Sequence, residues 1–216
     1  VTAIETNCRL IIDEMAKVAA VVDPGGEVDA ILKAIKKEGV CVEVVLLTHA
    51  HFDHSGGVKA LLERLAKIQG KAPRFMAHRE EKMMREHVID QIKMFGVVGS
   101  DGENCPEPDH YLEDDEIFNV GSLSVKALFT PGHSPGHLSY YIAEPEPTVC
   151  SGDALFRGGI GRTDLIGSDY DTLMKSIRIK LFGLPDDCAV LPGHGGDTTI
   201  GIEKKTNPFM NLKTAV

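Results

Sequence analysis

Residues 44–54 read VVLLTHAHFDH, so an apolar run typical of a buried strand leads directly into a loop rich in metal-ligand side chains. In an extended segment alternate side chains point to the same face, and His49 and His51 can therefore reach one ion. Asp53 and His54 follow around the turn, toward the position of a second ion. A lone His-x-His pair is common by chance, but four candidate ligands within six residues predict a metal-binding loop.

Three further candidate ligands stand directly after apolar runs that end in glycine, namely His133, Asp153 and His194. If the strands lie in facing sheets with their ends on one side, all these loops meet in one pocket. Imidazole and carboxylate ligands without a nearby cysteine pair suit zinc, ferrous iron or manganese in a catalytic centre. Asp153 could bridge two ions that hold a hydroxide between them. We expect His137 to be structural, because His133 already follows the strand directly.

The composition excludes several classes of protein. The formal net charge of −9 over 216 residues disfavours nucleic acid as a partner. No apolar run approaches the roughly 20 residues that a membrane span needs, and no leader pattern is visible, so we expect no membrane partner and a cytoplasmic location. The five cysteines are odd in number and widely spread, which predicts free thiols. The pattern gives no indication of the oligomeric state.

Strand-like apolar runs alternate with amphipathic helical patterns, which is typical of an α/β core with helices covering the sheets. Strands are predicted over residues 18–22, 40–47, 74–77, 123–129, 138–142, 148–150 and 189–191. Helices are predicted over residues 28–39, 58–70 and 169–181. The segment 96–109 fits neither period, and loops of this length are usually functional.

The ligand pattern H-A-H-F-D-H, followed by His133, Asp153 and His194, resembles the metallo-β-lactamase superfamily over nearly the whole chain. The resemblance implies an α/β fold, the αβ/βα four-layer sandwich, with residues 1–216 forming a single domain that lacks a full C-terminal helical domain. It also implies two divalent metal ions, with zinc the expected metal and iron or manganese compatible. By that resemblance the first ion is held by His49, His51 and His133, the second by Asp53, His54 and His194, and Asp153 bridges them.

Within the superfamily the chain resembles the glyoxalase II branch, in a short form. Five strings in combination carry this likeness: TPGHSPGH (130–137), SGDALF (151–156), GIGRTD (159–164), LPGHG (191–195) and TNPF (206–209). The branch hydrolyses S-2-hydroxyacylglutathione thioesters to a hydroxy acid and glutathione, which implies a small glutathione conjugate as the partner. The implied nucleophile is a metal-bridging hydroxide held near Asp53, the catalytic residue. By motif position Arg162 and Tyr140 would bind the glutathione part of the substrate.

Two departures from the branch leave an alternative open. Long glyoxalase II enzymes carry a C-terminal helical domain with further glutathione contacts, and the given sequence lacks a full domain of this kind. The tyrosine that the branch has after the basic residue is also absent, and Thr163-Asp164 stands in its place. The Gly-Arg-Thr-Asp string also resembles glutathione persulfide dioxygenases, in which the equivalents of His49, His133 and Asp153 bind one ferrous ion. The ligands do not separate the two reactions. The ending Thr206-Asn207-Pro208-Phe209 favours the hydrolase, and the complete ligand set disfavours a non-catalytic scaffold.

Overall fold

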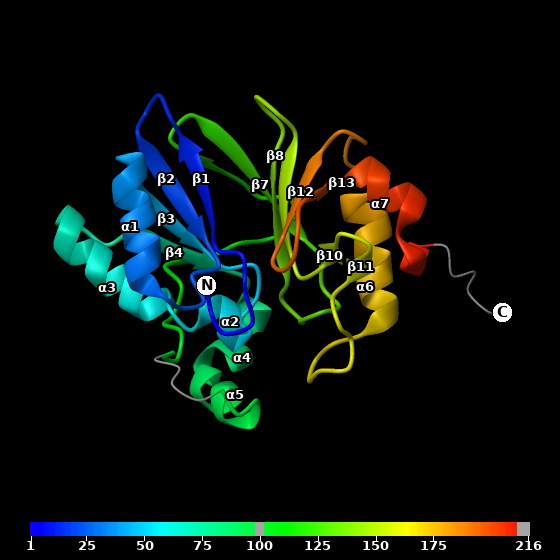
Figure 1. Ribbon diagram of the computed structural model, residues 1–216, viewed down its shortest axis with the longest axis horizontal. Helices are drawn as coiled ribbons and strands as arrows, with labels where there is room; N and C mark the ends of the chain where they lie inside the picture. The colour runs from blue at the N-terminus through cyan, green and yellow to red at the C-terminus, as the bar shows by residue number, and fades with distance from the viewer. Residues whose placement is uncertain (98–101, 211–216) are drawn as a thin grey trace.

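Two β-sheets pack face to face, and helices cover the outer face of each, in the computed structural model of the chain (Figure 1). The structure describes residues 1–97 and 102–210. The predicted αβ/βα four-layer sandwich is confirmed. Within the described residues, none of the helices has the length and apolar character needed to cross a membrane.

The first half of the chain builds one sheet in the order β1-β2-β3-β4-β5, in which only β1 and β2 are antiparallel. Its strands are β1 (Arg9–Asp13), β2 (Val18–Val22), β3 (Cys41–Leu46), β4 (Arg74–Ala77) and β5 (His110–Tyr111). Its helical segments are α1 (Val28–Glu38), α2 (Phe52–Ser55), α3 (Val58–Gln69), η1 (Arg79–Glu81), α4 (Lys82–Glu86) and α5 (Val88–Met94). Helices α1 and α3 bury apolar stripes against the sheet, through Ile31, Ile35, Val58, Leu61 and Leu65.

The second half builds the facing sheet, in the order β13-β12-β9-β8-β7-β6. Its strands are β6 (Ile117–Val120), β7 (Leu123–Phe129), β8 (Leu138–Ile142), β9 (Thr148–Gly152), β12 (Ala189–Pro192) and β13 (Thr198–Thr199), with a separate small hairpin of β10 (Leu155–Phe156) and β11 (Gly159–Ile160). Its helical segments are α6 (Tyr170–Ser176), η2 (Ile177–Leu181), α7 (Ile200–Thr206) and η3 (Pro208–Met210). The predicted helix 169–181 is confirmed, with Asp169 as its N-cap and a last turn of π type.

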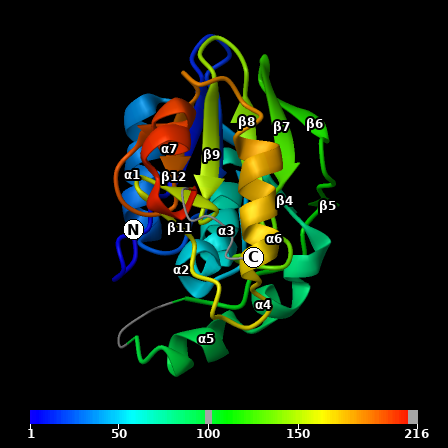
Figure 2. The same ribbon diagram turned by 90° about the vertical axis from the view of Figure 1, so that its right-hand side faces the viewer.

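The strand ends that carry the candidate ligands share one end of the sandwich. In both views the short helix α2, the next element after β3, lies at this end together with α4 and α5 (Figures 1 and 2). Part of the predicted long loop, residues 102–109, has no helix or strand, and residues 98–101 of that prediction lie outside the described part of the chain.

The core between the sheets contains Tyr140, and this position contradicts its predicted role in substrate binding. Its side chain is fully buried, and its hydroxyl donates a hydrogen bond of 2.7 Å to the carbonyl of Leu47 across the sheet interface. Burial raises the pKa of Tyr140 well above its usual range, so the phenol stays a donor. The strand 138–142 was predicted correctly from its apolar run, but the alternation along β8 turns the side chain of Tyr140 into the core between the sheets and away from the cavity lining.

Replacing Tyr140 with Phe should therefore lower stability and leave substrate binding unchanged. The carbonyl of Leu47 loses its buried donor, which costs about 1–3 kcal/mol in the free energy of unfolding. Urea denaturation measures this loss, and the neighbouring variant Tyr141→Phe, on the opposite face of β8, is the control with little effect. An unchanged stability together with a raised KM for an S-2-hydroxyacylglutathione, the substrate that the resemblance implies, would restore the binding role.

Candidate metal centre

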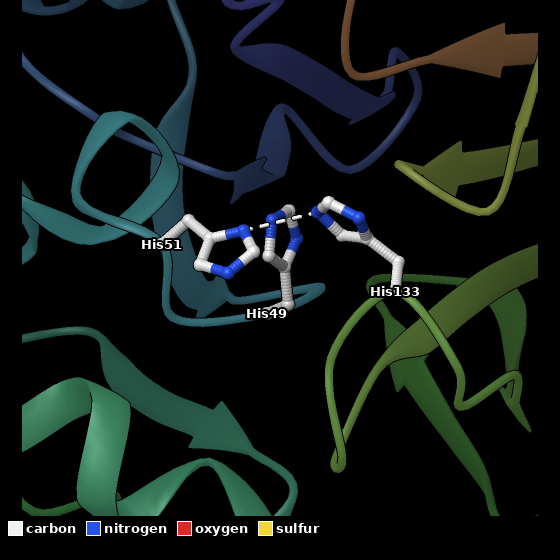
Figure 3. A group of neighbouring side chains, drawn as sticks. All are labelled: His49, His51 and His133. Atoms are coloured by element: carbon white, nitrogen blue, oxygen red, sulfur yellow. Dashed lines mark hydrogen bonds between the residues drawn. The ribbon is translucent and has the colours of Figure 1, made fainter. Parts of the chain in front are cut away.

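The structure brings all seven predicted ligands together at one edge of the two sheets. Their ligand atoms form three groups, each with all atoms within 4.8 Å of one another: His49, His51 and His133; His49, His54 and Asp153; and Asp53, His54 and His194. Figure 3 shows His49, His51 and His133 converging from two different loops, with His51 Nδ1 3.0 Å from His133 Nε2. The clustering expected from the strand ends is therefore confirmed.

The arrangement of donor atoms fits bound cations. His49 Nε2, His51 Nε2 and Asp153 Oδ1 are buried and have no hydrogen-bond partner among residues 1–97 and 102–210. Buried polar atoms are normally paired, so unpaired ones within such a cluster indicate a further partner, and His51 also turns its Nδ1 toward His133 Nε2. Imidazole nitrogens and carboxylate oxygens are the donor set that zinc, iron and manganese accept. The cluster is thus suitable for a dinuclear site, with its first and third groups at opposite ends.

Burial controls the charge of the histidines at the first group. It lowers the pKa of His49 well below the ordinary value, with further lowering from the neighbouring imidazoles. Burial and the nearby His133 lower the pKa of His51 to about 3. Both rings are therefore neutral at physiological pH, and a neutral imidazole is the form that binds a metal.

Carboxylates dominate the other end of the cluster. Burial opposes the charge of His54, yet Asp53, Asp153 and Asp23 outweigh it and raise the pKa of this ring well above the usual value. Burial also opposes ionisation of Asp53, but the charge of His54 and hydrogen bonds from neighbouring groups hold its pKa well below the usual range. For Asp153, burial is the largest effect and raises the pKa. This end consequently offers negative charge that a cation would compensate.

Asp23 orients one of the ligands, and the sequence analysis missed it. The residue follows β2 in the Asp23-Pro24-Gly25-Gly26 turn, where its carboxylate accepts from His54 Nδ1 at 3.0 Å. It also accepts from the backbone N–H and the hydroxyl of Thr48, each at 2.7 Å. A proton on Nδ1 leaves His54 Nε2 free to face the centre. The signal in the sequence is an aspartate that directly follows the buried strand β2.

The turn after Asp23 needs a glycine to approach the ligand loop. A Cβ on Gly25 would lie 1.4 Å from the carbonyl oxygen of Asp53, a distance that no side chain can tolerate. The backbone of the turn therefore lies directly against the loop that carries Asp53 and His54.

Glu81 is the second residue that the sequence analysis missed, and it joins the loops of the first ligand group. One carboxylate oxygen accepts the backbone N–H of Ala50, between His49 and His51, at 2.7 Å. The other accepts from the hydroxyl of Ser134 and, at 2.7 Å, from the backbone N–H of Gly136. The side chain is buried, so these bonds act without competition from water. Glu81 thus fixes the distance between the loop of His49 and His51 and the loop of His133.

His137 has the structural position that the sequence predicted. It is fully buried, and its Nε2 accepts the backbone N–H of Asp153 at 3.0 Å while Nδ1 lies 2.9 Å from the hydroxyl of Thr130. Both ring nitrogens are thus engaged within the protein, which leaves none for a metal. The ring holds the Asp153 loop against the loop that starts at Thr130.

A cavity of about 480 Å³ opens over the cluster, and Arg162 stands at its wall. The guanidinium is exposed and makes two hydrogen bonds to Asp164, at 2.7 and 2.8 Å. The backbone carbonyl oxygen of Arg162 lies 2.9 Å from His133 Nδ1, and this contact orients the His133 ring. Of the two residues predicted to bind substrate, the structure therefore places Arg162 at the cavity and excludes Tyr140 from it.

The comparisons with known proteins agree with this geometry. The sequence model of the metallo-beta-lactamase superfamily matches residues 1–194. Hydroxyacylglutathione hydrolase GloC of Haemophilus influenzae is 39% identical over 216 residues, covering 99% of this chain and 97% of that protein. The structure of TTHA1623 in a di-iron-bound form is similar with a TM-score of 0.84 and 34% identity, covering 97% of each chain. ETHE1 from Myxococcus xanthus follows with a TM-score of 0.74 and 29% identity, covering 97% of this chain and 81% of that one.

The Asp23→Asn variant tests the orientation of His54. An amide at this position donates to His54 Nδ1, which moves the ring proton to Nε2, the nitrogen that faces the cluster. We expect zinc affinity at the group of Asp53, His54 and His194 to fall about 10- to 100-fold, as measured by competition with a chelator. Asp13→Asn is the matched control, because Asp13 is a buried aspartate at the end of β1, where it pairs with Val18 at the start of β2. Equal losses of affinity in both variants would contradict the orienting role.

The Glu81→Gln variant tests the link between the loops. Its amide nitrogen cannot accept a hydrogen bond, so one of the two loops loses its anchor. Zinc affinity at the group of His49, His51 and His133 should decrease by about 10-fold or more. Glu203→Gln is the control, because Glu203 is an equally buried carboxylate that binds Thr198 and Asn207 instead. The role of Glu81 is refuted if only the thermal stability changes and the zinc affinity stays at the wild-type value.

Proposed function

Because the chain belongs to the metallo-β-lactamase superfamily, we propose that it hydrolyses glutathione thioesters, converting an S-2-hydroxyacylglutathione to a hydroxy acid and glutathione. The observation that carries the proposal is the complete set of seven converging ligands beneath an open cavity. The 39% identity to a hydroxyacylglutathione hydrolase, over 99% of this chain, supports this choice of substrate.

The ligand groups suggest how two ions would be held. His49, His51 and His133 would hold the first ion, Asp53, His54 and His194 the second, and Asp153 lies where it would be shared. Zinc is the expected metal, while iron and manganese suit the same donors. When bound, such a pair of ions supplies a hydroxide at neutral pH and polarises the thioester carbonyl.

Asp53 is the residue that we assign to orienting the nucleophile. Its Oδ2 accepts from the hydroxyl of Thr6 at 2.8 Å and lies 3.1 Å from His194 Nε2, so the carboxylate is fixed at the cavity floor. Its lowered pKa keeps it ionised and able to accept a hydrogen bond from the attacking water. The departing group is a thiolate, whose conjugate thiol has a pKa of about 8.5, so the chain need not supply a general acid.

Arg162 is our candidate contact for a carboxylate of glutathione. It stands at the cavity wall, and its planar guanidinium suits a bidentate carboxylate partner. Asp164 already occupies this fork, so the substrate has to compete with an intramolecular carboxylate. The contact is therefore expected to affect KM more than kcat.

A mononuclear iron persulfide dioxygenase is the second candidate, because the likeness to ETHE1 covers 97% of this chain. Identity favours the hydrolase, at 39% with GloC against 29% with ETHE1. The two reactions differ in what they consume. Thiol release from S-D-lactoylglutathione without oxygen uptake supports the hydrolase, and oxygen uptake with glutathione persulfide supports the dioxygenase.

The Asp53→Ala variant tests the hydrolase directly. Removing the carboxylate should lower kcat for thioester hydrolysis about 1000-fold, which corresponds to about 4 kcal/mol of barrier. The assay follows thiol release at saturating substrate. Asp197→Ala is the control, an exposed aspartate that pairs with Arg9, and its kcat should stay within about twofold of wild type. Thioester hydrolysis at the wild-type rate in Asp53→Ala would overturn the assignment.

A further inference from the structure

One wall of the cavity beside the metal cluster is apolar and aromatic. Ile4, Phe52 and Phe95 form it, from the N-terminal segment, from α2 and from the end of α5. The rings of Phe52 and Phe95 lie 5.5 Å apart with a tilt of 34°, and Phe95 and Ile4 are each 47% exposed. The wall thus presents apolar surface that is still open to solvent, directly next to the candidate ligands.

Besides the candidate ligands, the described lining of the cavity offers little polar surface. Among the described residues that line it, those outside the ligand cluster are all apolar except Arg162. Arg162 comes from the second half of the chain, as do the apolar lining residues Phe156, Ile160 and Leu165. The part of the cavity from the second half of the chain therefore carries the cation Arg162 and the ring of Phe156, whereas the part from the first half is uncharged outside the ligand cluster and carries the contacting rings of Phe52 and Phe95.

This asymmetry orients a thioester of glutathione. The peptide part carries two carboxylates, and we therefore place it near Arg162, the cation among the described lining residues outside the ligand cluster. The acyl part is then directed toward Phe52 and Phe95. A lactoyl group is small and carries a hydroxyl, so it would leave most of this wall exposed to water. An aromatic acyl group would cover the wall and stack on its rings.

We propose that the substrates of this centre are thioesters with an apolar, preferably aromatic, 2-hydroxyacyl group that packs on Ile4, Phe52 and Phe95. The proposal rests on the thioester hydrolysis proposed above and specifies its substrate class. Phe95 is then the specificity-determining residue, because it is the more exposed of the two rings.

The test compares S-D-mandeloylglutathione with S-D-lactoylglutathione. Both have the same leaving thiol and a 2-hydroxyacyl group, and they differ in a phenyl against a methyl substituent. Each kcat/KM is divided by the rate constant of hydroxide-catalysed hydrolysis in solution, which removes the intrinsic reactivity of the carbonyl. We expect the normalised value for the mandeloyl substrate to be at least about 10-fold higher with the wild-type protein.

The Phe95→Ser variant should reduce this preference about 10-fold. The measurement is a ratio within one preparation, so a smaller folded fraction lowers both rates equally and cancels. Ile4→Ser serves as a second variant, with a smaller expected reduction. Met94→Ala is the matched control, since Met94 precedes Phe95 and is 66% exposed but lies outside the cavity lining. It should leave the ratio at the wild-type value.

The outcomes separate the two proposals. A normalised ratio near one in the wild-type protein, or a ratio unaffected by Phe95→Ser, overturns the substrate class while thioester hydrolysis stands. If neither thioester is hydrolysed, the proposed function fails and the substrate class fails with it. A high ratio that falls in Phe95→Ser and persists in Met94→Ala supports the proposal.

Discussion

The structure depends on the close approach of buried imidazoles and carboxylates, several of whose polar atoms have no hydrogen-bond partner among the described residues. Burial strips water from His49 and His51, keeps both rings neutral and leaves their Nε2 atoms unpaired. Such atoms destabilise a fold unless something binds them, because each has lost its hydrogen bonds to water. A cation removes this cost and also compensates the carboxylates of Asp53 and Asp153. Without metal the centre therefore lowers the free energy of unfolding, and with metal bound it raises it.

The scaffold places these groups by linking loops that are far apart in the sequence. Glu81 joins the loop between β3 and α2 to the loop after β7, and His137 joins the loop after β7 to the one after β9. Asp23 fixes the tautomer of His54 from a fourth loop, the one after β2. Tyr140 bonds β8 to the carbonyl of Leu47, the first residue after β3.

The sequence predicted which seven side chains would cluster, because His and Asp are concentrated after the strands. Seven of the strands and the α/β layering followed from periodicity. The edge strands β1 and β6 were missed because their exposed and half-buried residues dilute the alternation. Asp23 and Glu81 were missed because their partners, His54 and the Ala50 and Gly136 amides, lie 31 to 55 residues away. Tyr140 was misassigned since motif position does not reveal which face a side chain takes.

The central claim is that two metal ions at this centre hydrolyse a thioester. The direct measurement is a titration of the metal-free protein with zinc, in which thiol release from S-D-lactoylglutathione is followed at each addition. Activity should rise until two equivalents of zinc are bound per chain and then remain constant, because the ligand groups at both ends of the cluster are required. Full activity at a single equivalent, or binding of two equivalents without any thiol release, would contradict the account.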